Sequence, residues 1–253
     1  MKNSIAPKEV LDVIEKYKTL RYKEFVTAVP YYRNKPFSFF TPPAEAGKGS
    51  PDEIQRYIDE IIARSPQAQK INSNEMFRSV LISFQIGVDC SGFVYHVLDA
   101  WAKVKHKKPL SYFLPKESPI FFRKFLSRIF KPQSSMSADD FTSEPFARQI
   151  KGTLNIRAGD LIRTKNGDHV LIIISTEIVG DNYEIVAYQS SDSHIPHGLV
   201  KTLIHTPCEY LDISAGYWTD IGTLRRYEQV SYSGYISGGG SIWRPRFLEI
   251  DEI

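Results

Sequence analysis

The spacing of apolar residues changes near the middle of this chain, and that change constrains the fold more than any other feature. Up to about residue 104, apolar side chains recur at helical spacing, whereas from Ile156 onward they fall into short runs typical of β-strands. A block of helices followed by a block of antiparallel strands predicts an α+β fold, with N-terminal helices packed on an antiparallel sheet.

Four helices are expected in the first half. The first covers about residues 7–21. The second starts at Ser50-Pro51-Asp52-Glu53, where a serine cap, a proline in the first turn and two acids mark a helix start, and it ends near residues 65–66. The third covers about residues 74–84, and the fourth runs from Cys90 to about Val104. The second helix is expected to turn five side chains inward: Ile54, Tyr57, Ile58, Ile61 and Ile62.

The second half is expected to form the sheet. A turn at 156–160 leads into a strand, and further strands are expected at 169–175, 183–190, 199–205, 223–231 and 241–247. Between the halves, residues 105–153 differ in character. An aromatic and basic amphipathic helix is expected at 119–131, which could pack as a lid, lie on a membrane surface or bind a partner. Residues 134–140 are expected to be a flexible link.

The segment Asp89-Cys90-Ser91-Gly92-Phe93 carries the clearest chemical signal. A cysteine at a helix start lies among unpaired N–H groups at the positive end of the helix dipole, and both favour the nucleophilic thiolate. His169 stands at the mouth of a strongly apolar strand downstream, where it could act as general base. The alternative is a buried structural thiol beside an ordinary strand-end histidine. Cys208 has no such context and is interpreted as an incidental thiol.

Composition sets only broad limits. The 253 residues carry a formal net charge of +3 without a clustered basic element, so nucleic acid is not an expected partner. Two cysteines exclude a disulfide framework, and no motif indicates a metal site or a cofactor. The N-terminus lacks the apolar stretch of a signal peptide, which predicts a cytoplasmic protein. A chain whose leader had been removed would look the same and could be exported or associated with the cell wall.

Four motifs in order resemble the NlpC-type cell-wall cysteine peptidases. They are Asp89-Cys90-Ser91-Gly92-Phe93, Ala158-Gly159-Asp160-Leu161, Asp168-His169-Val170 and the terminal Trp243-Arg244-Pro245-Arg246-Phe247. The resemblance implies a reduced papain-like fold over residues 86–253, interrupted by the inserted segment at about 105–153. Residues 1–85 would then be a helical extension packed on this core.

The resemblance also implies roles for individual residues. Cys90 would be the nucleophile and His169 the base, while the third, polar position would fall on the strand after the histidine strand. Gln189 is the preferred third residue, because an amide can accept a hydrogen bond from imidazole, and Tyr188 is the alternative if the register differs by one. Asp89, Ser91, Tyr31 and Tyr188 are expected to contact substrate. A Pro-Tyr pair normally precedes the cysteine in this family, and the resemblance implies that Pro30-Tyr31-Tyr32 would be its displaced counterpart, with residues 38–86 inserted.

Three functions follow as hypotheses. The first is a cysteine hydrolase that cleaves amide bonds through a thioester, with peptides or muropeptides of peptidoglycan type as the implied substrates. The second is an acyltransferase that passes the acyl group to a lipid or an amine. The third is a catalytically silent binding module that keeps the fold, which the missing third histidine and the altered segment before Cys90 make credible.

Overall fold

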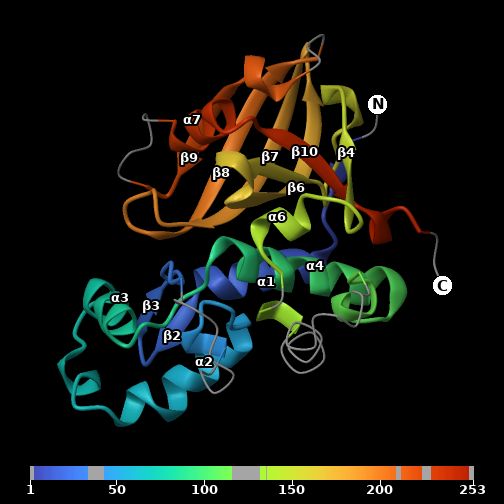
Figure 1. The fold of residues 1–253 in the computed structure, drawn as a ribbon. Helices are drawn as coiled ribbons and strands as arrows, with labels where there is room; N and C mark the ends of the chain where they lie inside the picture. The colour runs from blue at the N-terminus through green and yellow to red at the C-terminus, as the bar shows by residue number, and fades with distance from the viewer. Residues whose placement is uncertain are drawn as a thin grey trace.

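The helices of the first half lie on one side of the main antiparallel sheet (Figure 1). The computed structural model describes residues 3–33, 43–115, 132–134, 136–208, 212–223 and 229–250. The expected combination of helices with an antiparallel sheet is confirmed. The helix expected at 119–131 lies outside the described residues, and with it the lid, membrane and partner hypotheses. Among the described helices, none has both the length and the apolar character needed to cross a bilayer.

The sheet has the strand order β4-β10-β5-β6-β7-β8-β9, and every neighbouring pair is antiparallel. Strands β5 to β9 follow one another as a meander, and β10 returns to lie between β4 and β5. The short strand β1 pairs with the second half of β6. The strands are β1 (Ser4–Ile5), β4 (Ala147–Ile150), β5 (Leu161–Thr164), β6 (His169–Val179), β7 (Asn182–Ser191), β8 (Gly198–Pro207), β9 (Tyr217–Ile221) and β10 (Ser241–Pro245).

The helix starts expected from the sequence are confirmed. Ser50 accepts a hydrogen bond from the Glu53 N–H, and the Glu53 carboxylate accepts one from the Ser50 N–H, which together form a capping box. Ile61, expected to face inward, is instead 46% exposed, because the regular helix ends at Glu60 and Ile62 takes the buried position. The helices are α1 (Lys8–Lys18), α2 (Pro51–Glu60), α3 (Asn74–Ser83), α4 (Cys90–His106), α6 (Ala138–Phe141) and α7 (Val230–Ser237).

Two expectations about secondary structure are wrong, and one small sheet was not expected. Of the strand expected at 223–231, residues 224–228 lie outside the described residues, and the end is helical because α7 begins at Val230. The strand that pairs with β8 is β9 at Tyr217–Ile221. The residues of α7 suit a strand by propensity, but those that α7 buries recur at helical spacing. The link expected at 134–140 contains α6, which Ser137 and Asp140 cap reciprocally. The N-terminal region also holds a small two-stranded sheet, β2 (Leu20–Tyr22) with β3 (Phe25–Thr27).

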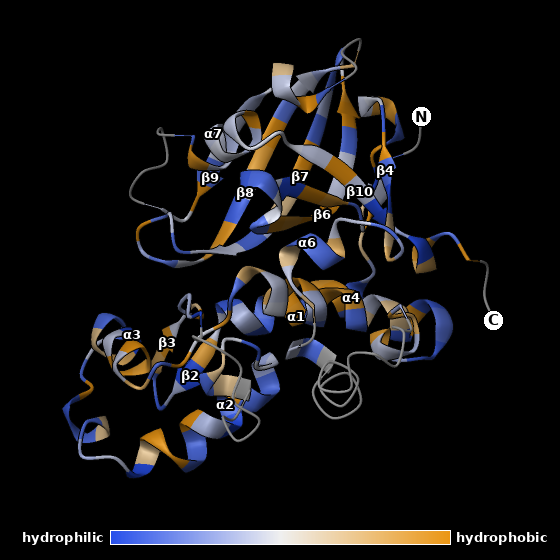
Figure 2. Ribbon diagram, viewed as in Figure 1, coloured by the Kyte–Doolittle hydropathy of each residue, from blue (hydrophilic) through white to orange (hydrophobic). Residues whose placement is uncertain are grey.

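Strand β6 is buried on both faces, which explains its continuous apolar sequence. Val170, Ile172 and Ile174 join the hydrophobic cluster under α1 and α4, and this cluster also includes side chains from the first 85 residues. Leu171 and Ile173 join a second cluster on the opposite face, with Trp218 and Tyr235. Figure 2 shows these hydrophobic stripes along the sheet and α4.

A buried ion pair joins two of the sequence motifs. Arg244 on β10 donates from Nε and Nη2 to the two carboxylate oxygens of Asp160 at 2.7 and 2.8 Å, and the Asp160 side chain is fully buried. Asp160 also accepts the Arg157 N–H at 2.9 Å. These bonds fix the turn before β5 to the returning strand β10, so Asp160 has a structural role.

Candidate active site

Cys90 is the first residue of α4, and the chain around it is closely packed. Asp89 is the N-cap, and its carboxylate accepts the Gly92 N–H at 2.6 Å. A Cβ at Gly92 would lie 2.5 Å from the Gly47 carbonyl oxygen, so only glycine allows the two segments to approach this closely. The Asp89 N–H donates to the same carbonyl at 2.9 Å. The helix start is therefore held firmly against residues 47–48.

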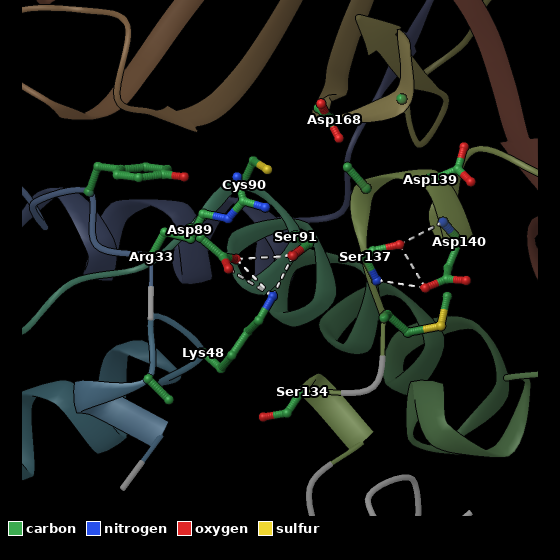
Figure 3. A pocket seen from close by; sticks show the side chains of 15 residues that line it. Arg33, Lys48, Asp89, Cys90, Ser91, Ser134, Ser137, Asp139, Asp140 and Asp168 are labelled. Atoms are coloured by element: carbon green, nitrogen blue, oxygen red, sulfur yellow. Dashed lines mark hydrogen bonds and ion pairs between the residues drawn. The ribbon is translucent and has the colours of Figure 1, made fainter. Parts of the chain in front are cut away.

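Cys90 lines a cavity of about 510 Å³ at the boundary between the helices and the sheet (Figure 3). One wall is formed by the start of α4 and residues 46–48, and another by Gly167 and Asp168, which directly precede His169. A third wall comes from residues 134 and 136–140. The segment between α4 and β4 thus contributes directly to the cavity.

A lysine that the sequence did not single out lies beside the start of α4. Lys48 Nζ is 2.9 Å from the Asp89 carboxylate and also contacts Ser91 Oγ, and both interactions are drawn in Figure 3. Ser91 in turn donates to Asp89 Oδ1 at 3.0 Å. Asp89 and Ser91, expected to bind substrate, do line the cavity, but Lys48 already occupies their polar groups. The sequence around Lys48, Gly47-Lys48-Gly49, gave no signal of this role.

The protonation state expected for Cys90 is wrong for the resting site. Burial raises the pKa of the Cys90 thiol to about 12, and the negative charge of Asp89 adds to this effect. The Lys48 ammonium and the N–H groups of Val170 and Ser91 act in the opposite direction but do not outweigh burial. The helix start alone therefore does not create a thiolate, because the thiol is only 7% exposed.

His169, the first residue of β6, comes directly before Val170, whose N–H lies close enough to the Cys90 thiol to lower its pKa. His169 itself is not among the residues that line the cavity. The Nε2 atom of His169 is 2.5 Å from Gln189 Oε1, while its Nδ1 has no hydrogen-bond partner in the described part of the chain. Burial lowers the pKa of His169 to about 4, so the imidazole is neutral at neutral pH.

The register of β7 decides between the two proposed third residues. Gln189 shares the buried face with Ala187 and contacts His169, as preferred from the sequence. Tyr188 points to the opposite face, where it packs against the helix-side cluster near Lys18 of α1 and does not line the cavity. Tyr188, expected to contact substrate, thus faces away from Gln189, because adjacent residues on a strand face opposite sides.

Tyr31 reaches the cavity as expected, although it lies far from Cys90 in sequence. The Val88 N–H donates to the Pro30 carbonyl at 3.0 Å, which lays residues 30–32 alongside the turn before Cys90. Burial and the nearby Cys90 raise the pKa of Tyr31, so its phenol is protonated at neutral pH and can donate a hydrogen bond. The Tyr32 hydroxyl instead donates to Gln85 outside the cavity.

Behind Gln189 lies a buried polar network that sequence reasoning missed. It contains Thr202, Asp220, Ser231 and His194, which come from β8, β9, α7 and the loop after β7. The alternation of Trp218 and Asp220 could have indicated a buried acid, but the strand was expected further along the chain. Across the described ranges, no group of three or more His, Cys, Asp or Glu side chains is arranged to hold a metal ion.

No protein-family model, curated protein or solved structure matches this chain.

Proposed function

We propose that this protein is a cysteine hydrolase that cleaves amide bonds through a thioester acyl-enzyme. One observation carries the proposal: Cys90 lines the cavity close to the N–H of Val170, while the preceding His169 is hydrogen-bonded through Nε2 to Gln189. A cysteine, an oriented imidazole and a third polar group in this order form the arrangement used for nucleophilic catalysis.

The first half-reaction starts from a neutral thiol and a neutral imidazole. Nδ1 of His169 accepts the thiol proton as the sulfur attacks the substrate carbonyl, forming the C–S bond and moving the carbonyl electron pair to oxygen. The intermediate then collapses, breaking the C–N bond, and the leaving amine takes the proton back from His169. The product is a thioester on Cys90.

Two donors beside the sulfur suit the developing oxyanion. The Cys90 N–H is the first of α4 and makes no hydrogen bond among the described residues, and the protonated Tyr31 phenol lines the same cavity. In the second half-reaction His169 accepts a proton from water, whose oxygen attacks the thioester. The released sulfur then recovers that proton.

The fold and substrate are proposed on the resemblance to NlpC-type peptidases. The start of α4 packed on an antiparallel sheet supports a reduced papain-like core. Peptides of peptidoglycan type are accordingly the first substrates to test. The cavity wall is polar, with Arg33 and Lys48 on one side and acidic side chains at 139, 140 and 168 on the other, which suits a peptide that carries charged groups.

The test combines a substrate panel with direct detection of the intermediate. Muropeptides and unrelated peptide amides are incubated with the parent, Cys90→Ala, His169→Ala and the matched cysteine control Cys208→Ala. We expect amine release from the parent and from Cys208→Ala, and a loss on the order of 10³-fold or more in the other two variants. Acid-quenched samples should carry the acyl group on Cys90.

The same experiment decides between the alternatives. If added amines or lipid alcohols capture the acyl group faster than water does, the protein is an acyltransferase. If no donor in the panel acylates Cys90, and its alkylation rate is the same in the parent and His169→Ala, the hydrolase proposal is wrong. The binding-module hypothesis would then take its place.

A further inference from the structure

In the buried network behind Gln189, the direction of every hydrogen bond is fixed, and Asp220 is the group that fixes it. An ionised carboxylate can only accept hydrogen bonds. Asp220 Oδ1 accepts the Ser231 hydroxyl at 2.6 Å and the Thr202 hydroxyl at 2.8 Å, and Oδ2 accepts the Ser231 N–H at 3.1 Å and His194 Nε2 at 3.0 Å. The carboxyl is fully buried, so all of its partners are protein groups.

The ionised form of Asp220 is stabilised by these bonds. Burial alone would raise the pKa of this carboxyl, but the hydrogen bonds from His194 and Ser231 outweigh burial and lower it. Asp220 therefore remains an acceptor throughout the neutral pH range.

The order passes from Asp220 to Gln189 through the two hydroxyl groups. Because the Ser231 and Thr202 hydrogens are directed at Asp220, their oxygens are left as acceptors. The Gln189 amide nitrogen donates to both, at 2.6 Å to Ser231 and 3.1 Å to Thr202. The amide group has one donor end and one acceptor end, so its carbonyl oxygen must face His169.

The last step fixes the imidazole. Gln189 Oε1, 2.5 Å from His169 Nε2, requires a proton on that nitrogen. A neutral ring carries only one N–H, so Nδ1 keeps its lone pair. We propose that Asp220 is a positioning residue that sets the tautomer of His169, acting through the two hydroxyls and Gln189 to leave Nδ1 free to accept a proton.

Asp220→Asn should reverse this order. The Ser231 N–H is a fixed backbone donor, so the asparagine oxygen must stay on its side, and the amide NH₂ then faces the two hydroxyls. Those hydroxyls become donors toward Gln189, whose amide turns over and presents NH₂ to His169. Nε2 must then accept, which places the imidazole proton on Nδ1. The tautomer change requires no substrate and does not depend on the proposed function; only its catalytic consequence does.

The experiment is ¹⁵N NMR of histidine-labelled protein at neutral pH, with the His169 signal identified by its loss in His169→Ala. We expect the parent to show a proton on Nε2, and Asp220→Asn to show it on Nδ1, with His169-dependent Cys90 alkylation falling on the order of 100-fold. Ser231→Ala and Thr202→Val are matched controls, because each leaves one hydroxyl relay intact, and both should keep the parent tautomer.

The double variant Ser231→Ala/Thr202→Val keeps the proposal testable if Asp220→Asn does not fold. It cuts both relays while preserving Asp220, so we expect signals from both tautomers. The proposal is overturned if Asp220→Asn and the double variant both keep the proton on Nε2, or if the parent carries it on Nδ1. A correct tautomer shift without any activity toward the substrate panel would instead contradict only the hydrolase function.

Discussion

Asp89 has two separate partners, the start of α4 and the Lys48 ammonium, and substitutions can separate their contributions. Asp89→Ala removes the cap bond to the Gly92 N–H, which costs about 1 kcal/mol for a typical N-cap. It also leaves Lys48 without its carboxylate. Breaking a buried pair costs about 3–5 kcal/mol. Because the Lys48 side chain is 13% exposed and can turn into the cavity, we expect about 2 kcal/mol here.

The expected total for Asp89→Ala is therefore about 3 kcal/mol of unfolding free energy. Asp89→Asn keeps an oxygen for the cap and should cost about 2 kcal/mol, through the ion pair alone. The double variant Asp89→Asn/Lys48→Met removes both charges and should lie within about 1 kcal/mol of the parent.

Urea unfolding measures all three variants, provided that the m-values stay constant. The ordering of the three costs is the critical result. The reasoning is refuted if Asp89→Ala costs less than about 1 kcal/mol, or if the double variant is no more stable than Asp89→Asn.

Three further predictions concern the Tyr31 phenol, the Asp160–Arg244 ion pair and the protonation of His169. Tyr31→Phe should slow acylation of Cys90 about 100-fold as an oxyanion donor is lost, and Tyr32→Phe should leave the initial rate unchanged. Asp160→Asn should lower the free energy of unfolding, measured in urea, by about 3 kcal/mol, because buried Arg244 loses its charged partner. Glu144→Gln, which removes the partner of Arg246 in an exposed ion pair, should lower it by less than about 1 kcal/mol. Burial lowers the pKa of His169 to about 4 in the folded protein. Between about pH 6.5 and 4 the imidazole therefore binds a proton in the unfolded state but not in the folded state, and the free energy of unfolding should fall as the pH drops through that window. When the free energy of unfolding is measured in urea at several pH values, its fall over this window should be about 3 kcal/mol smaller in His169→Gln than in the parent. An equal fall in the two proteins would contradict the prediction.

The local features of the site could be predicted from the sequence. The capped start at Asp89 and the turn before the apolar β6 depend on nearest neighbours along the chain. Gln189 was chosen from the family resemblance, with Tyr188 as the alternative one step along the strand. The two-residue period of a strand argued against Tyr188 once the buried face was known, but the sequence alone left the register open.

Long-range contacts account for what the sequence did not predict. Lys48 reaches Asp89 because glycines at 47 and 92 let two distant segments touch, and nothing in either segment indicates the partner. The protonation of Cys90 depends on how deeply α4 is packed, which composition does not reveal. Asp220 joins the site only because β9 lies beside β8, and propensity placed that strand several residues too late.

We propose that Cys90 and His169 act as a coupled nucleophile and base, and the pH dependence of Cys90 alkylation is the first measurement to make. Iodoacetamide labelling is followed by mass spectrometry in a Cys208→Ala background, with and without His169→Ala. We expect the alkylation rate of the parent to be nearly constant from about pH 5 to 9, since the pKa values of both groups lie outside this range. Without His169, the rate at neutral pH should be markedly lower. A parent rate that rises through about pH 8.5 like a free thiol, and is unchanged by His169→Ala, would contradict the coupling.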